Sequence, residues 1–230
     1  MSENNLIQPT DRRSFLGSLA TGAAALGLSA FASPSKLEAA ANELDPDLAD
    51  PDAWFNQIKG KHRIVFDVPQ PNEVYPFAWS RIFLVTNSKT GTPESDCSVV
   101  VVIRHTAIGY TMANPLWEKY NFGEFFKVEN QDKTPATKNP FWQTEPFNVP
   151  GVGPVPIAIN DLQKSGVLFC VCDMALTVYS AVAAGKMNMK PEDVKKEWVA
   201  GLLPGIQVVP SGVWALGRAQ EKGCGYIFTG

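Results

Sequence analysis

Cys172 ends an apolar run, residues 167–172, that follows Gly166. Such a run is typical of a strand buried on both faces, as in parallel sheets. From Asp173 onward the apolar residues recur at helical spacing, so a helix is expected to begin directly after the cysteine. A helix amino terminus lowers the pKa of a thiol, and the thiolate is the reactive form of cysteine. Cys172 is therefore the candidate catalytic residue.

Two interpretations of Cys172 remain open on these grounds. The neighbouring anion Asp173 raises a thiol's pKa, and many free cysteines are simply buried structural residues. Cys170 lies two positions earlier, so its side chain points to the same face of the strand. Alternate positions of one extended strand fit disulfide geometry poorly, and a Cys-x-Cys pair is too small a ligand set for a metal. Cys170 is expected to be a core residue, and no metal site and no cofactor are predicted.

Arg104 and His105 follow a continuous β-branched strand, residues 97–103. The carboxyl ends of parallel strands meet at one sheet edge, where ligands bind, so both residues are expected near Cys172. His105 could exchange a proton with a thiolate or ligate a metal or haem. Arg104 could hold an anion such as sulfite or thiosulfate. The alternative is a histidine hydrogen-bonded in a loop and an arginine paired with a carboxylate.

Ser211 and Gly212 come at the expected start of another helix and supply backbone N–H groups to the same edge. Such groups cradle anions, although a serine there can also be a plain N-cap. Cys97 and Cys224 each precede an expected strand and so share the opposite edge. If their strands are neighbours, an oxidising compartment would allow a disulfide between them.

The chain has 230 residues, of which 45% are hydrophobic and 19% are charged, with a net charge of -3. This composition indicates a globular protein and argues against a nucleic-acid partner, which would require a basic surface. Four cysteines are too few for a disulfide scaffold.

Residues 1–41 are predicted to be a signal peptide, because Arg12 and Arg13 precede Ser-Phe-Leu and an apolar, Ala- and Gly-rich run. The order matches the twin-arginine export pattern, and the run is too short for a stable membrane span. We therefore expect export by the twin-arginine machinery to the periplasm or the cell exterior. The alternative is a disordered tail with two chance arginines. Residues 42–60 are expected to form a leading arm.

Strands and helices alternate along residues 61–230, which predicts one α/β domain with a mainly parallel sheet covered on both faces. A proline- and aromatic-rich insertion at about residues 121–156 interrupts this pattern. We expect it to be ordered and to cover a site or a neighbouring subunit. A helix over about residues 73–88 has two apolar stripes, which predicts burial on two sides and hence a subunit interface.

Several of these segments together resemble the DsrE/DsrF family, and more closely its exported branch. The similar segments are residues 99–105, 162–172 and 208–213, followed by Gly223 and Tyr226. The resemblance spans roughly residues 61–228, interrupted by the insertion. It implies a five-stranded, three-layer α/β/α sandwich that assembles as a homo-oligomer, either a trimer or a hexamer.

The resemblance also implies sulfur relay, since some members carry a persulfide on a strand-end cysteine at the position of Cys172. Sulfur donor and acceptor proteins would then be partners. The first hypothesis is an exported protein that handles a sulfur species on Cys172, with Arg104, His105, Ser211 and Gly212 as substrate-binding residues. The others are a non-catalytic oligomeric binding module and a metal- or haem-associated redox accessory that uses His105.

Overall fold

The structure, a computed structural model, describes residues 51–130, 132–149 and 151–230. The predicted signal peptide with Arg12 and Arg13, and residues 42–50 of the predicted arm, lie outside this range. No helix in the described residues is long and apolar enough to cross a membrane.

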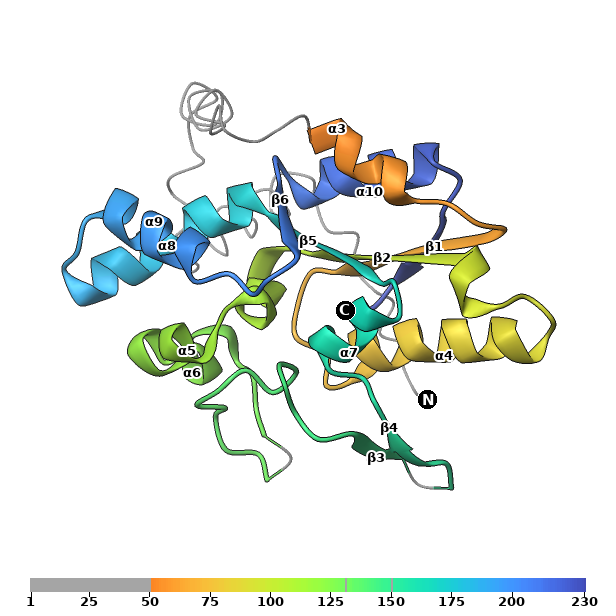
Figure 1. Cartoon of the computed structure of the whole chain (residues 1–230). Helices are drawn as coiled ribbons and strands as arrows, with labels where there is room; N and C mark the ends of the chain where they lie inside the picture. Colours follow the sequence, from red (N-terminus) through yellow and green to blue (C-terminus); the bar gives the residue numbers. More distant parts are fainter. Residues whose placement is uncertain (1–50, 131, 150) are drawn as a thin grey trace, which may run out of the picture. The chain divides into compact units, whose positions relative to one another are not determined.

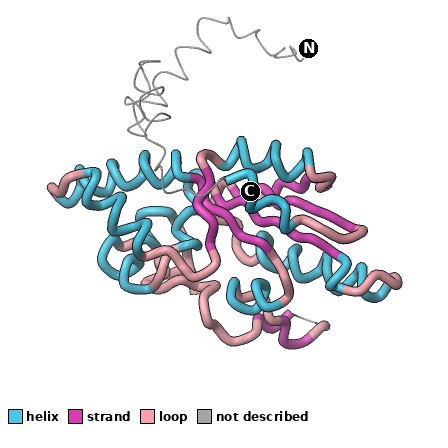
Figure 2. The backbone as a smooth tube through the Cα atoms, turned by 45° about the horizontal axis from the view of Figure 1, so that its top comes forward, coloured by secondary structure: helices cyan, strands magenta, loops and turns pink. Residues whose placement is uncertain are grey.

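Five parallel strands form the central sheet, in the order β6-β5-β2-β1-β7 (Figure 1). They are β1 (His62–Val68), β2 (Cys97–Ile103), β5 (Leu168–Cys172), β6 (Ile206–Val209) and β7 (Gly225–Phe228). Helices cover both faces, and Figure 2 shows the strands enclosed between them. The predicted three-layer α/β/α sandwich with a five-stranded parallel sheet is confirmed.

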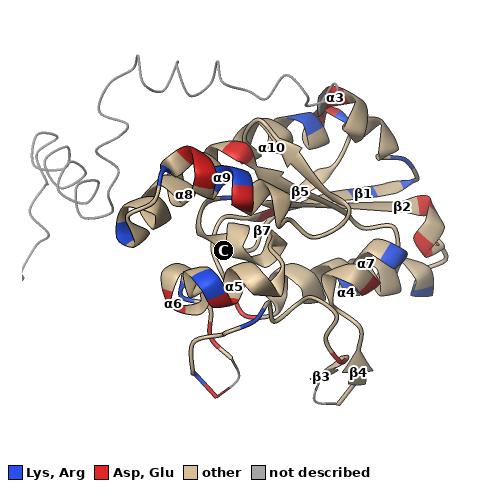
Figure 3. Ribbon diagram, turned by 60° about the vertical axis from the view of Figure 1, so that its left-hand side comes forward, with Lys and Arg blue, Asp and Glu red and all other residues tan. Residues whose placement is uncertain are grey.

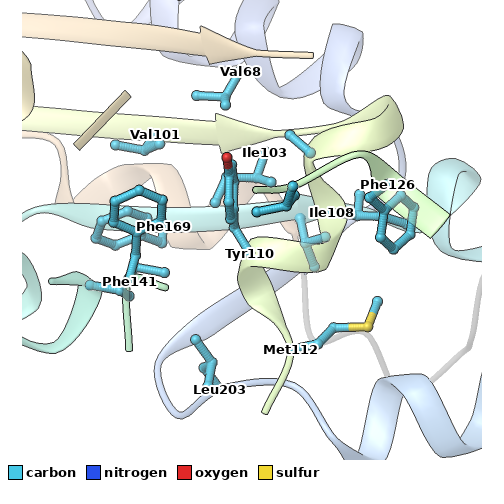
Figure 4. Packing of buried hydrophobic residues seen from close by; sticks show 14 of the residues in the cluster. Val68, Val101, Ile103, Ile108, Tyr110, Met112, Phe126, Phe141, Phe169 and Leu203 are labelled. Atoms are coloured by element: carbon cyan, nitrogen blue, oxygen red, sulfur yellow. The ribbon is translucent and has the colours of Figure 1, made fainter. Parts of the chain in front are cut away.

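The two faces of the sheet carry separate apolar cores. One core lies beneath α10 (Gly212–Glu221) and includes Val65, Val102 and Cys170. The larger core lies on the side of α4 (Tyr75–Lys89) and includes Phe66, Val101 and Phe169. Figure 4 shows Val101, Phe141, Phe169 and Tyr110 packed together in the larger core. Alternation of side chains along each strand sends neighbouring residues to opposite cores.

The larger core also contains helices from the chain between and after the strands. They are α5 (Asn114–Tyr120), α6 (Phe122–Phe126), α7 (Ile159–Lys164), α8 (Asp173–Met187) and α9 (Pro191–Ala200). Trp198 of α9 packs edge-on against Tyr120 and Phe122, with ring centroids 5.5 and 5.0 Å apart. Figure 3 shows acidic and basic residues interspersed on the helices, with both signs on α9.

The predicted insertion is ordered over its described residues and contributes to the core. It contains α6 and an antiparallel hairpin, β3 (Phe147–Val149) with β4 (Gly153–Val155). Phe126, Val128 and Phe141 are buried in the larger core. Packing within this chain therefore accounts for these apolar residues.

Two element predictions need correction. Helix α4 buries one stripe, with Phe77 and Leu84 inside, whereas Ile82 is 56% exposed. Within the single chain the buried stripe, which also includes Pro76 and Ser80, is therefore neither of the two predicted stripes. The second correction concerns the leading arm. From α3 (Pro51–Trp54) and a 3-10 turn, Phe55–Gln57, the chain is folded onto the smaller core, where Phe55 and Ile58 are buried.

Candidate functional site

Cys172 lies where β5 passes directly into α8 and is the N-cap residue of that helix. Its Sγ accepts a hydrogen bond from the Ala175 backbone N–H at 3.3 Å. The backbone amides of Met174 and Gly212 also lie close enough to this sulfur to favour its charged form. The residue is 7% exposed. The sulfur atom thus lies in a small, nearly closed site lined by backbone N–H groups.

The sheet register explains why donors from two helices reach one sulfur. Cys172 of β5 pairs with Val209 of β6, and α10 begins at Gly212, shortly after β6 ends. Helices α8 and α10 therefore start side by side at the carboxyl edge of the sheet. Both amino termini carry partial positive charge, which stabilises an anion placed between them.

Burial nevertheless raises the pKa of the Cys172 thiol, and burial is the largest effect on it. The Gly212, Ala175 and Met174 amides act in the opposite direction, while the Asp173 carboxylate raises the pKa further. Asp173 itself is paired with Lys195, with Oδ2 and Nζ 2.9 Å apart. The prediction that the helix start lowers this pKa is therefore wrong in sum, because desolvation outweighs the amides.

Arg104 makes a two-point ion pair with Asp67, at 2.7 Å from Nε to Oδ1 and 3.0 Å from Nη2 to Oδ2. The Tyr226 hydroxyl donates to the same carboxylate at 2.8 Å, and Asp67 is only 1% exposed. The alternative of an arginine paired with a carboxylate thus describes the resting protein. The hydrogen bond to Asp67 raises the pKa of Arg104, and Cys172 is close enough to add to that effect.

Gly212 packs against Arg104, and its backbone amide lies close to the Cys172 sulfur. A Cβ at Gly212 would lie 2.7 Å from Cβ and 2.8 Å from Cδ of Arg104, so the arginine side chain runs against the glycine whose amide reaches Cys172. Among the described residues, Arg104 Nη1 has no hydrogen-bond partner, and the side chain is 25% exposed. One face of the guanidinium is therefore available to an anion.

His105 is exposed beside this group and adopts a left-handed backbone conformation, with φ of 50°. Its ring meets Tyr179 of α8 edge-on, at 5.6 Å between centroids. Partial burial and then the Arg104 charge lower the pKa of His105. The imidazole is therefore neutral at pH 7 and can accept a proton, although within the described part of the chain it makes no hydrogen bond to Cys172.

Ser211 is the N-cap of α10, with its Oγ accepting from the Trp214 N–H at 3.2 Å. That hydrogen bond occupies the hydroxyl in the way a plain N-cap does. The structure therefore brings Cys172, Gly212 and Arg104 together, places His105 at the rim, and gives Ser211 a role in starting the helix.

The conditional disulfide between Cys97 and Cys224 is not present. Both residues carry free thiols. In the sheet, β1 lies between β2, which contains Cys97, and β7, which follows Cys224. Their strands are not neighbours, so the condition for the prediction is not met. Cys170 is fully buried in the smaller core, as expected of a core residue, and burial raises its pKa. Cys172 instead belongs to the larger core, so the expectation that the two cysteines share one face is wrong at this strand end.

Asp67 and Tyr226 belong to the site but were not singled out as site residues from the sequence. Asp67 is the one acidic residue in an otherwise apolar stretch of β1. A carboxylate buried in such a strand requires a partner of opposite charge, so its position was a local signal of a buried ion pair. Tyr226 is the second residue of β7 and reaches Asp67 only because β7 pairs with β1. Among the described residues, no group of three or more His, Cys, Asp or Glu side chains is arranged to hold a metal ion.

No protein-family model matches the chain, and no curated protein matches it. Among solved structures, the chain is similar to a protein of unknown function, MTH1491, from Methanobacterium thermoautotrophicum. The two share 19% sequence identity over 73% of this chain and 99% of the other, with a TM-score of 0.34.

Proposed function

We propose that the protein carries a sulfane sulfur atom on Cys172 as a component of a sulfur relay. The observation that supports this most is the convergence of two helix amino termini on one sulfur, beside an arginine with a free nitrogen. A persulfide is more acidic than a thiol, so a persulfide on Cys172 would be ionised at neutral pH, and the nearby Arg104 guanidinium would favour that anion.

The transfer needs no oxidant if the donor is itself a persulfide, R–S–SH. The Cys172 sulfur attacks the outer sulfur of the donor, forming a new S–S bond while the donor S–S bond breaks. The donor leaves as a thiolate and takes up the proton that Cys172 releases. The products are the Cys172 persulfide and RSH, and the reverse sequence passes the sulfur to an acceptor thiol. His105, neutral and at the rim, is placed to accept the proton in transit.

Exposure to glutathione persulfide, followed by intact-protein mass spectrometry, tests this function. We expect a mass gain of one sulfur atom that dithiothreitol removes. Cys172→Ala should abolish the gain, whereas the matched variant Cys97→Ala should retain it. Loading that persists in Cys172→Ala would end the proposal.

Arg104→Gln tests the role of the guanidinium in the same assay, because it removes the charge beside the sulfur. We expect slower loading and faster spontaneous loss of sulfur. A variant that is folded by circular dichroism and loads at the normal rate would remove Arg104 from the site.

The proposal includes export, with donor and acceptor proteins outside the cytoplasm. It is supported by the order of Arg12, Arg13 and the apolar run that follows. Cell fractionation of the full chain should place the mature protein in the periplasm, and exchanging both arginines for lysine should retain the precursor inside. Equal fractionation of the two forms would contradict export by this route.

A homo-oligomer, a trimer or hexamer by the resemblance, is a second proposal that a specific observation favours. β7 is an edge strand, and Tyr226, Ile227 and Phe228 on it are all exposed. Exposed apolar edge strands are normally paired or covered. Light scattering should give a mass of several chains, and Phe228→Lys should lower it. A monomer at micromolar concentration would contradict this proposal.

A further inference from the structure

A cavity of about 700 Å³ opens between the end of β1 and the insertion. It is lined by Asn72 and Val74 from the β1–α4 connection, by Tyr110, and by Val128, Phe141 and Phe147 from the insertion. This volume lies within the range of small-molecule sites, which are mostly apolar with a few polar groups.

The cavity is separate from the Cys172 site. Tyr110, Val128 and Phe141 belong to the larger core on the α4 side of the sheet. Asp67 lies between Phe66 and Val68, which face that same core, so its side chain points to the other face. Cys172 also belongs to the larger core, but neither it nor Arg104 or Gly212 lines the cavity.

The inner wall presents one unpaired polar group. Tyr110 is 2% exposed, and within the described residues its hydroxyl has no hydrogen-bond partner. Figure 4 shows this hydroxyl directed toward Val68, the last residue of β1. The chain that follows β1 forms part of the cavity wall. The Tyr110 hydroxyl is not sealed off from solvent, so it can donate a hydrogen bond to a ligand oxygen.

The rim carries two lysines and two glutamates, so its formal charges sum to zero, but the ion pairs are uneven. Lys133 lies 3.9 Å from carboxylate oxygens of both Glu73 and Glu129. Lys127 is exposed and forms no ion pair with any described residue. Glu73, Lys127 and Lys133 all have positive φ values, 44°, 57° and 67°. Non-glycine residues in this conformation are uncommon and gather at ligand sites.

We infer that this cavity binds a small organic anion with an apolar, preferably aromatic, body. The body contacts Phe141 and Phe147, the Tyr110 hydroxyl bonds to a ligand oxygen, and Lys127 pairs with the anionic group. The inference stands independently of sulfur transfer, because it uses none of the residues around Cys172.

Calorimetric titration of the full chain with 3-phenylpropanoate, and with the neutral isostere 3-phenylpropanol, tests the inference. We expect the acid to bind about fivefold more tightly than the alcohol, the size of one exposed ion pair. Lys127→Glu should weaken binding of the acid by about tenfold, since attraction is replaced by repulsion, and leave the alcohol unchanged.

Lys138→Glu is the matched control, because Lys138 is exposed on the same insertion but does not line the cavity. It should bind the acid as the parent does. Tyr110→Phe keeps the ring, removes the hydroxyl and should weaken binding about fivefold. Lys127→Ala serves if Lys127→Glu does not fold.

The inference is overturned if neither probe binds at millimolar concentration, or if acid and alcohol bind equally. It is also overturned if Lys127→Glu and Lys138→Glu weaken binding to the same extent. Failure of these titrations would leave sulfur loading of Cys172 unaffected.

Discussion

At the scale of single residues, Cys172 is subject to two opposing effects. Backbone amides from α8 and α10 favour a negative sulfur, whereas burial disfavours it and has the larger effect on the pKa. The free thiol is therefore protonated at neutral pH and protected from adventitious oxidation. An attached sulfur atom would move the negative charge from Sγ to the outer sulfur.

Alkylation by iodoacetamide should reveal this balance. The rate at Cys172, followed by peptide mass spectrometry, should rise with pH and reach half its maximum above the value of about 8.5 typical of free cysteine. The same cysteine in urea-unfolded chain is the control and should titrate at the ordinary value. A midpoint below about pH 7 would mean that the helix starts, not burial, dominate.

Asp67 holds Arg104 and Tyr226 together. Asp67→Ala should cost about 3 kcal/mol of unfolding free energy, because it leaves a partly buried guanidinium without its partner. Tyr226→Phe removes one hydrogen bond while the ion pair persists, so it should cost only about 1 kcal/mol. Urea denaturation measures both. Equal losses would show that the ion pair contributes nothing beyond the hydroxyl.

At the scale of elements, the start of α10 determines where Arg104 lies. Gly212→Ala would bring a Cβ within 2.8 Å of the arginine side chain, which must then move away from Asp67 or from the helix. We expect a loss of about 1–2 kcal/mol and slower sulfur loading of Cys172.

Gly217→Ala is the matched substitution in the same helix. No atom lies within 4 Å of its added Cβ, so the change should raise stability by about 0.5–1 kcal/mol through helix propensity and leave loading intact. Thermal unfolding distinguishes the two variants. If Gly212→Ala is also stabilising, the close packing of Arg104 on α10 has no energetic weight.

At the scale of the whole molecule, burial raises the pKa of several thiols at once. Cys170 and Cys172 are affected, and burial raises the pKa of Cys224 to about 11. The unfolded chain releases these protons first, near pH 8.5, so it binds fewer protons than the folded chain above that value. The contribution of these thiols to folding stability is thus fully present below about pH 8.5. It is lost as the pH rises toward the pKa values of the thiols in the folded chain.

Urea midpoints measured from about pH 7 to pH 11 should therefore fall on the alkaline side. Cys224→Ala should make that fall shallower, because one titrating group is gone. An unchanged midpoint across this range would show that the thiols titrate alike in both states.

The architecture was predictable because the strands are continuous apolar runs and the helices between them have clear starts. β1, β2 and the cysteine strand β5 lie where those runs place them. No local sequence pattern specifies the order of the strands in the sheet. The sequence therefore did not reveal that β1 separates Cys97 from Cys224, or that Tyr226 approaches Asp67. The balance of burial against helix amides at Cys172 likewise depends on packing that no local pattern specifies.

The most direct test of the central claim is peptide mapping of the intact, wild-type protein after reaction with a persulfide donor at neutral pH. We predict that the added sulfur is found on the peptide containing Cys172, attached to that residue, with Cys97 and Cys224 unmodified. Sulfur distributed over Cys97 and Cys224, or absent from Cys172, would contradict the account.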